Sequence, residues 1–272
     1  MNNNFFSDNI EDKVVSSLYF LKTFSKYNHN NNEGKIPFTY QDKLSNNLTF
    51  LREKLNLEAI EGSGSELQKL MRLLKWSSAY LKYEGKIIND RRYDQCDWFE
   101  VIAKSKQEGY KLNCRYIALL FTQVLLAAGF KARWVSCLPV ELISKERHCV
   151  TEVYVKSLYK WVVFDAAYNL VYFDKKGTLL NLFDMRNLII REEKFRFFTK
   201  STGDYDYIWS CWVNHIFRFQ YLLNNHYNML STEKQVFLYL NPGNYLTEEE
   251  NSDEDLYQAK NIFYFDDDRL FT

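Results

Sequence analysis

The sequence predicts an α+β fold in which a buried central helix packs on an antiparallel β-sheet, with additional N-terminal and C-terminal helices. Two observations lead to this prediction. Residues 114–128 are apolar around almost the whole circumference of a helix, which indicates a helix inside the core. The next segments, 132–135, 149–155 and 161–165, are rich in Val, Trp and Tyr and are separated by short polar turns, as expected for neighbouring antiparallel strands.

The composition is that of a globular chain with a sizeable core and no overall charge. Of its 272 residues, 46% are hydrophobic and 17% aromatic, and 35 basic residues balance 35 acidic ones. Such a chain buries enough apolar surface to fold, and its zero net charge provides no field that would attract nucleic acid or anionic lipid. We therefore expect neither nucleic acid nor membrane as a partner.

Targeting and cysteine patterns favour a cytoplasmic protein. The longest apolar stretches, 117–121 and 124–130, are shorter than the roughly 20 residues that span a bilayer, and the first residues lack a secretory signal. The five cysteines contain no Cys-x-x-Cys pair, which argues against a disulfide framework or a structural zinc site. We expect free thiols, no metal site and no required cofactor.

The chain is expected to divide into an N-terminal helical extension, residues 1–60, and a main domain, residues 61–272, that together form one compact unit. Within the extension, 14–24 has helical apolar spacing and 28–32 is a polar loop. The main domain begins with a helix over 66–83, because Ser65 and Gln68 have the spacing of a capping box.

The elements after residue 180 are predicted from aromatic and apolar clusters. We expect a helix-like segment over 181–198 and a long buried helix over 207–230, with His215 and His226 nearly on one face of it. Too far apart to bind one metal ion together, these histidines are interpreted as core or surface residues. Two short strands, 236–240 and 262–265, are expected to flank a solvated acidic loop at 248–255.

Cys114 begins the predicted central helix. Asn113 is a favourable N-cap residue and Gly129 suits the C-terminal end, so both ends of the helix are marked. The unpaired amides at a helix start carry about half a positive charge, which would lower the pKa of the thiol. A lone buried cysteine is more often structural, so a catalytic interpretation depends on neighbouring groups.

His148 begins one predicted strand and Asp165 ends the next. If residues 156–159 form the turn, Val155 lies opposite Lys160, and His148 and Asp165 become a diagonal pair on one face of the hairpin. A slip of one residue would place them on opposite faces.

The same alternation places Cys149 on the other face from His148, pointing away from the proposed site. Taken singly, His148 and Asp165 are ordinary strand-end residues. Together with Cys114 they match the nucleophile, base and orienting acid of thiol acyl transfer.

Residues 66–190 resemble the transglutaminase-like superfamily, with matching segments at 113–120, 126–135, 148–154 and 160–165. The resemblance implies a papain-like, cysteine-peptidase-like core in which Cys114 is the nucleophile, His148 the general acid/base and Asp165 its partner. Val150 and Ala166 differ from the family pattern, and they bear on the reaction subtype more than on the triad.

A second oxyanion donor is needed besides the Cys114 amide. Trp98, Gln107 and Tyr110 lie upstream and are the candidates, although each also fits a structural role. Asn169, four residues after Asp165, either supports the site or ends the strand.

The predicted function is thiol-dependent acyl transfer or hydrolysis of an amide bond, peptide or glutaminyl, in a protein, peptide or glycopeptide substrate. Protease, transglutaminase and amidase chemistry all remain open, as does oligomeric state. The alternative is a non-catalytic peptide- or glycan-binding module that keeps the scaffold, since aromatic side chains also suit a binding surface. A zinc protein using Cys and His is a third hypothesis, which predicts stoichiometric metal.

Overall fold

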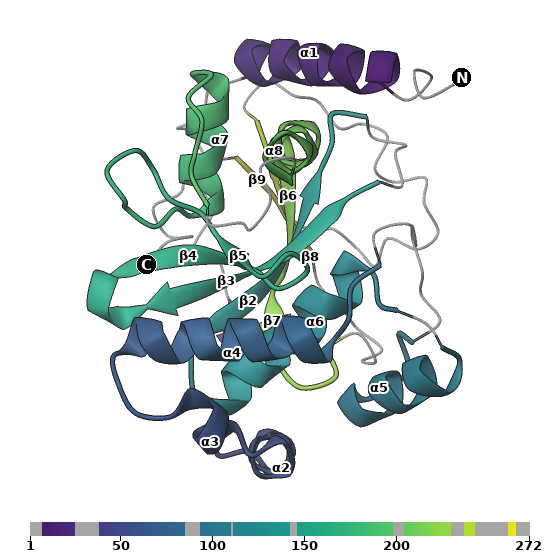
Figure 1. Ribbon diagram of the computed structural model, residues 1–272, viewed down its shortest axis with the longest axis vertical. Helices are drawn as coiled ribbons and strands as arrows, with labels where there is room; N and C mark the ends of the chain where they lie inside the picture. The colour runs from purple at the N-terminus through teal and green to yellow at the C-terminus, as the bar shows by residue number, and fades with distance from the viewer. Residues whose placement is uncertain are drawn as a thin grey trace.

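The computed structural model describes residues 7–24, 38–84, 93–109, 111–141, 146–197, 204–229, 237–242 and 261–264. Within these ranges, a seven-stranded sheet of order β5-β4-β3-β2-β6-β8-β9 lies between helices on both faces (Figure 1). All neighbours in this sheet are antiparallel except β8 and β9. The predicted α+β architecture is confirmed, while the expected loops at 28–32 and 248–255 fall outside the described residues.

The strands of the large sheet are β2 (Ala132–Leu138), β3 (His148–Val155), β4 (Lys160–Asp165), β5 (Leu170–Val171), β6 (Arg218–Leu222), β8 (Phe237–Asn241) and β9 (Asn261–Tyr264). A separate parallel pair joins β1 (Thr39–Tyr40) to β7 (Asn224–Asn225). The helices are α1 (Ser7–Thr23), α2 (Asn46–Leu55), α3 (Leu57–Glu61), α4 (Glu66–Tyr80), α5 (Trp98–Gln107), α6 (Cys114–Ala127), α7 (Leu182–Ile190) and α8 (Asp204–His215), with a 3-10 turn η1 (Lys156–Leu158) between β3 and β4.

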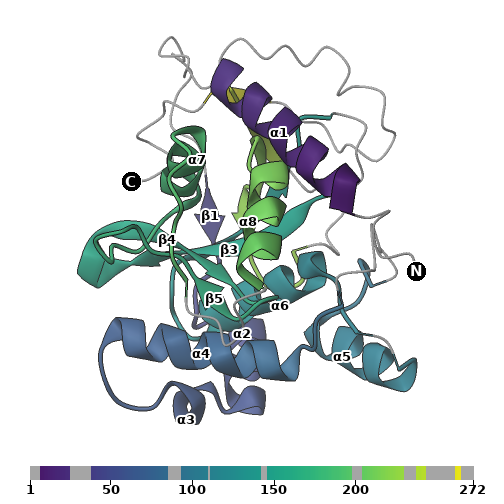
Figure 2. The ribbon, with the colours of Figure 1, turned by 45° about the horizontal axis from the view of Figure 1, so that its top comes forward.

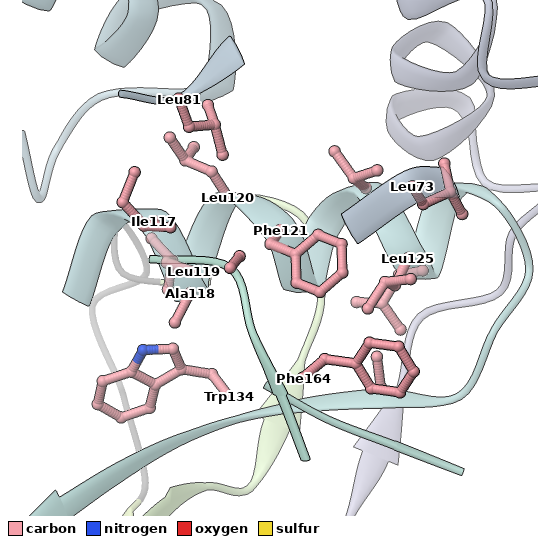
Figure 3. Packing of buried hydrophobic residues seen from close by; sticks show 14 of the residues in the cluster. Leu73, Leu81, Ile117, Ala118, Leu119, Leu120, Phe121, Leu125, Trp134 and Phe164 are labelled. Atoms are coloured by element: carbon pink, nitrogen blue, oxygen red, sulfur yellow. The ribbon is translucent and has the colours of Figure 1, made fainter. Parts of the chain in front are cut away.

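Helix α6 is buried between the sheet and the outer helix α4. Figure 3 shows its apolar side chains between Leu73 and Leu81 on one side and Trp134 and Phe164 of the sheet on the other. Every residue from Tyr116 to Ala127 is buried, which explains why the sequence of this helix is apolar all round.

Two threonines attach α6 to the middle of β3. Thr151 Oγ1 donates to the carbonyl oxygen of Ala118 at 3.0 Å, and it lies 3.0 Å from Thr122 Oγ1. Both hydroxyls are fully buried, so each needs this partner to offset the loss of water. These contacts fix the position of α6 along β3, and therefore the position of Cys114 at the start of α6.

The two faces of the sheet carry separate apolar clusters. Trp134, Val153 and Phe164 face α6, whereas Val135 and Val150 face the opposite cluster. That second face is covered by α7 and α8, and α1 packs against both of them; in Figure 2, α1 passes across the end of α8. The central strands are buried on both faces, which is why they show little polar alternation.

The predicted helix over 207–230 is wrong beyond His215. Helix α8 ends there, and the chain continues as β6 between β2 and β8. All five β6 residues are buried, and polar Arg218 and Gln220 alternate with apolar Phe219 and Tyr221; this period-2 pattern is typical of a strand but covers only four residues of a longer aromatic segment. His215 therefore ends α8, while His226 follows β7, and the two do not share a helix face.

The residues expected to form one N-terminal extension lie on both sides of the sheet. Helix α1 packs beside α7 and α8, whereas Leu48 and Leu51 of α2 belong to the cluster around α6. In the described part of the chain, no helix combines the length and apolar character needed to cross a bilayer.

Candidate active site

Cys114 is the first residue of α6, and the local sequence fixes this helix start. The side chain of Asn113 caps the helix by accepting from the Tyr116 amide at 3.1 Å. Arg115 forms a two-point ion pair with Asp94, at 2.5 and 3.0 Å, which attaches the first turn to the preceding segment. Cys114 is partly buried, and its Sγ lies 3.6 Å from the carbonyl oxygen of Arg147.

His148 and Asp165 are brought together as the hairpin register predicts. Val155 pairs with Lys160, and the His148 Nε2 lies 2.8 Å from Asp165 Oδ2. Both side chains are buried, with exposed fractions of 2% and 0%. The second carboxylate oxygen, Oδ1, accepts from the Tyr168 amide at 3.3 Å, so both oxygens of Asp165 have donors.

The Asp165 carboxylate governs the protonation of His148. Burial alone would lower the pKa of this imidazole, but the charge and hydrogen bond of Asp165 raise it to about 10, with a smaller contribution from Cys114. The ring is therefore charged at neutral pH, with Nε2 donating to the carboxylate.

Cys149 lies close to the Cys114 thiol, so the prediction that it points away from the site is wrong. The strand alternation itself is confirmed, because Cys149 packs in the α6 cluster and Val150 in the opposite one. Cys114 however approaches from the α6 face, the same face as Cys149 and opposite to the face of His148. The candidate residues thus meet around the start of β3 rather than on one face of the sheet.

This placement raises the pKa of Cys114 well above its ordinary value, opposite to the expectation from the helix start. The main causes are a hydrogen bond with Cys149 and burial, while His148 lowers the pKa. Burial would raise the pKa of Cys149 as well, but hydrogen bonds with Cys114 and Ser136 lower it. The two thiols therefore behave as a coupled pair, with His148 favouring the charge on Cys114.

Residues 53–166 match the family model described as the transglutaminase-like superfamily. This segment is a transglutaminase-like domain. It includes α4, α6 and β2 to β4, and with them Cys114, His148 and Asp165.

A solved structure is also similar to the chain. It is described as a "Putative Cysteine Protease from Cytophaga hutchinsonii", with 17% identity and a TM-score of 0.33, and the match covers 56% of this chain. The chain spans about half of that protein, because the match covers 49% of its length. No curated protein matches the sequence.

Of the three side chains expected to supply a second oxyanion donor, two lie within the described residues. The indole Nε1 of Trp98 is buried and donates to the carbonyl oxygen of Leu120 at 3.2 Å, so this N–H is already used. Gln107 is exposed at the end of α5, and Tyr110 lies outside the described residues. Asn169 is exposed in the turn before β5, where its φ of 57° serves the turn.

Tyr83 is a residue near Cys114 that sequence reasoning missed. It forms an isolated parallel bridge with Leu112, two residues before Cys114. Burial and then the charge of Cys114 raise the pKa of Tyr83, so its hydroxyl stays protonated. No local pattern marks this residue, because the bridge joins segments about thirty residues apart.

A ring of aromatic side chains surrounds the His148 imidazole in the transglutaminase-like domain. Trp212 of α8 packs edge-on against it at 5.3 Å, and Tyr168 lies 5.5 Å away. Tyr168 also contacts Tyr83 at 5.2 Å and the exposed Tyr207 at 6.3 Å between ring centroids. These contacts limit the movement of the imidazole. They also form a continuous series of rings from His148 through Tyr168 to the exposed Tyr207.

Within the described ranges, no group of three or more His, Cys, Asp or Glu side chains is arranged to hold a metal ion. His215 is partly buried beside the Cys211 thiol, and its Nδ1 lies 2.7 Å from the Cys211 carbonyl oxygen. Burial lowers its pKa to about 4, which keeps it neutral.

Proposed function

We propose that this chain catalyses thiol-dependent acyl transfer or amide hydrolysis through Cys114, His148 and Asp165. The observation that carries the proposal is the buried 2.8 Å contact between His148 Nε2 and Asp165 Oδ2, beside a helix that begins with Cys114. A buried imidazole with a carboxylate partner is held in one orientation, and its positive charge favours a thiolate on Cys114.

In the proposed reaction, Cys114 reacts as the thiolate of a thiolate–imidazolium pair with His148, and its Sγ attacks the carbonyl carbon of an amide. The S–C bond forms as the carbonyl π electrons move onto oxygen, and the C–N bond then breaks while the His148 imidazolium gives its proton to the leaving amine. Water or a second amine attacks the resulting thioester, with neutral His148 accepting its proton, and Cys114 leaves as a thiolate. Asp165 stays ionised throughout and stabilises the charged imidazole.

The proposed oxyanion donors are the backbone N–H of Cys114 and the hydroxyl of Tyr83. The first amides of a helix have no intrahelical acceptor, so the Cys114 N–H can face a developing negative charge. Tyr83 keeps its proton because its pKa is raised, which a donor requires.

The proposed substrate is a protein, peptide or glycopeptide carrying the amide. Cys114 is only partly buried, which suits a nucleophile that must meet a chain-like substrate. The partly buried Tyr168 and the exposed Tyr207 lie in sequence from His148 outward and offer apolar and hydroxyl contacts to such a chain.

Site-specific alkylation tests this proposal. If the His148 imidazolium stabilises the Cys114 thiolate by more than burial and Cys149 oppose it, iodoacetamide near pH 6 should modify Cys114 much faster than Cys96 and Cys211, which are also partly buried and serve as internal standards. His148→Ala should abolish the advantage. His215→Ala is the matched control, since it removes another histidine, partly buried, beside a cysteine, Cys211, and should leave the advantage intact.

Intact-mass detection of an acyl-enzyme gives the direct test. Peptide, glutaminyl and ester substrates should each be offered, and a mass increase lost in Cys114→Ala identifies both chemistry and acyl donor. Uniform slow alkylation with no adduct from any substrate would contradict the enzyme proposal and favour a non-catalytic binding module.

A further inference from the structure

We propose that Tyr172 is a positioning residue for the catalytic pair, acting through Asp165 to set how strongly His148 holds its proton. The inference rests on the proposed function, and it concerns a residue that lies beyond the 53–166 match. Tyr172 follows β5 directly, and it lies seven residues after Asp165 in the chain.

The geometry places two donors on one carboxylate oxygen. Tyr172 OH donates to Asp165 Oδ2 at 2.9 Å, and the same Oδ2 lies 2.8 Å from His148 Nε2. Tyr172 has an exposed fraction of 0%, so no water competes for this hydroxyl. Two donors on one oxygen share its negative charge. The hydrogen bond from Tyr172 therefore weakens the interaction of Asp165 Oδ2 with His148, and the reverse is also true.

Trp212 keeps the hydroxyl in this position. Its ring packs edge-on against Tyr172 at 5.3 Å and 85°, and against His148 at 5.3 Å and 86°. The phenol and the imidazole are therefore held against one indole while both reach Asp165. Burial and the Asp165 charge raise the pKa of Tyr172 well above its ordinary value, so the phenol remains a donor at any pH the protein tolerates.

The remaining titratable neighbours of the pair lie on several elements. They are Cys114 of α6, Cys137 of β2, Cys149 of β3, Tyr168 of the turn after β4, and Cys211 and His215 of α8. Burial raises the pKa of the Cys137 and Cys211 thiols and of the Tyr168 phenol, and it lowers that of His215 to about 4. From pH 5 to alkaline values, the described neighbours expected to change charge together with His148 are therefore the paired thiols Cys114 and Cys149.

Removing the Tyr172 hydroxyl should raise the pKa of His148. In Tyr172→Phe, Asp165 Oδ2 has lost one donor, so it stabilises the imidazolium more strongly. We expect the His148 pKa to increase by about 0.5 to 1 unit, the effect of one neutral hydrogen bond. His148 then gives its proton less readily to the leaving amine, and kcat should fall about threefold to tenfold with little change in KM.

The decisive measurement is the NMR titration of the His148 ring nitrogens in the full chain. The sequence contains four histidines, so His148→Ala assigns the signal directly. The matched control is Tyr221→Phe, because Tyr221 is another buried tyrosine whose hydroxyl donates to a buried carboxylate, Glu152 Oε2, at 3.1 Å. That variant should leave the His148 titration unchanged.

A second substitution protects the test against misfolding. Incorporation of 3-fluorotyrosine in place of Tyr172 keeps the hydroxyl and makes it a stronger donor, so the His148 pKa should move downward. Opposite shifts in the two variants support the proposal. An unchanged titration in the fluorinated protein, or the same shift in Tyr221→Phe, would overturn it.

The two proposals fail in different ways. A native chain that forms an acyl-enzyme, with a His148 titration that does not respond to either change at Tyr172, would overturn the role of Tyr172 alone. A native chain that forms no acyl-enzyme with any substrate class would overturn the proposed function, and with it the catalytic meaning of Tyr172.

Discussion

His148 begins β3 and Asp165 ends β4, and their side chains meet at 2.8 Å in a region from which water is excluded. They stand seventeen positions apart in the chain, at the two ends of one hairpin. Low local polarity strengthens the interaction, so the carboxylate offsets the cost of a buried charge on the imidazole.

Asp165→Asn should reverse the protonation preference of His148. Without the carboxylate, burial dominates and favours the neutral ring, so the pKa should fall from about 10 to below its ordinary value near 6.5. The ring then stays neutral at pH 7 and cannot supply the proton for the leaving group. We expect kcat/KM to fall about a thousandfold or more, by analogy with other triads.

The measurement combines a pH–rate profile with NMR titration of His148. Asp174→Asn is a suitable control, because Asp174 accepts the Lys176 and Thr178 amides in an exposed turn, and an asparagine can accept them too. A His148 that remains protonated at pH 8 in Asp165→Asn would show that another group sets its charge.

Cys149→Ala should lower the pKa of Cys114. The hydrogen bond with Cys149 is the largest cause of the raised pKa, and its removal leaves His148 as the main polar neighbour of the thiol. More thiolate then exists at a given pH, so alkylation of Cys114 should become about tenfold faster at pH 6 for each unit of pKa lowered.

The pH dependence of iodoacetamide labelling, read by peptide mass, checks this prediction. Cys137→Ala removes a buried cysteine from the neighbouring strand β2 and is the matched control, expected to leave the Cys114 profile in place. A Cys149→Ala profile that coincides with that of the native chain would refute the coupling between the two thiols.

Arg133→Met should destabilise the fold strongly. Arg133 forms an ion pair with Glu152 at 2.7 Å, and the two side chains are 1% and 0% exposed. Loss of the cation leaves a buried carboxylate without its charge partner, which costs about 3 to 5 kcal/mol in the free energy of unfolding. Methionine retains much of the packing against Trp161, whose ring lies 3.9 Å from the guanidinium.

Chemical denaturation measures this difference. Lys175→Met is the control, since Lys175 pairs with Glu193 at 3.7 Å with 70% of its side chain exposed, and its loss should change the unfolding free energy by less than about 1 kcal/mol. Equal effects of the two substitutions would contradict the expectation that loss of the buried Arg133–Glu152 pair lowers the unfolding free energy more than loss of the exposed Lys175–Glu193 pair.

Signals confined to a few neighbouring residues predicted the local structure well. The capping box of Ser65 and Gln68 and the cap of Asn113 are confirmed, because each depends on contacts within one helical turn. The segment 207–230 was predicted wrongly because aromatic residues continue from α8 into β6, and the polar–apolar alternation from Arg218 to Tyr221 that marks the strand is only four residues long.

By itself, the sequence determined that His148 and Asp165 meet, because a short turn fixes hairpin register and register fixes which side chains share a face. The tertiary structure decided which face α6 covers, and hence that Cys149 lies beside Cys114, that the pKa of Cys114 is raised, and that Tyr172 reaches Asp165. The physical reason is that docking of a helix on a sheet, and the packing of α8 on its other face, depend on contacts between residues far apart in the chain, which no local pattern records.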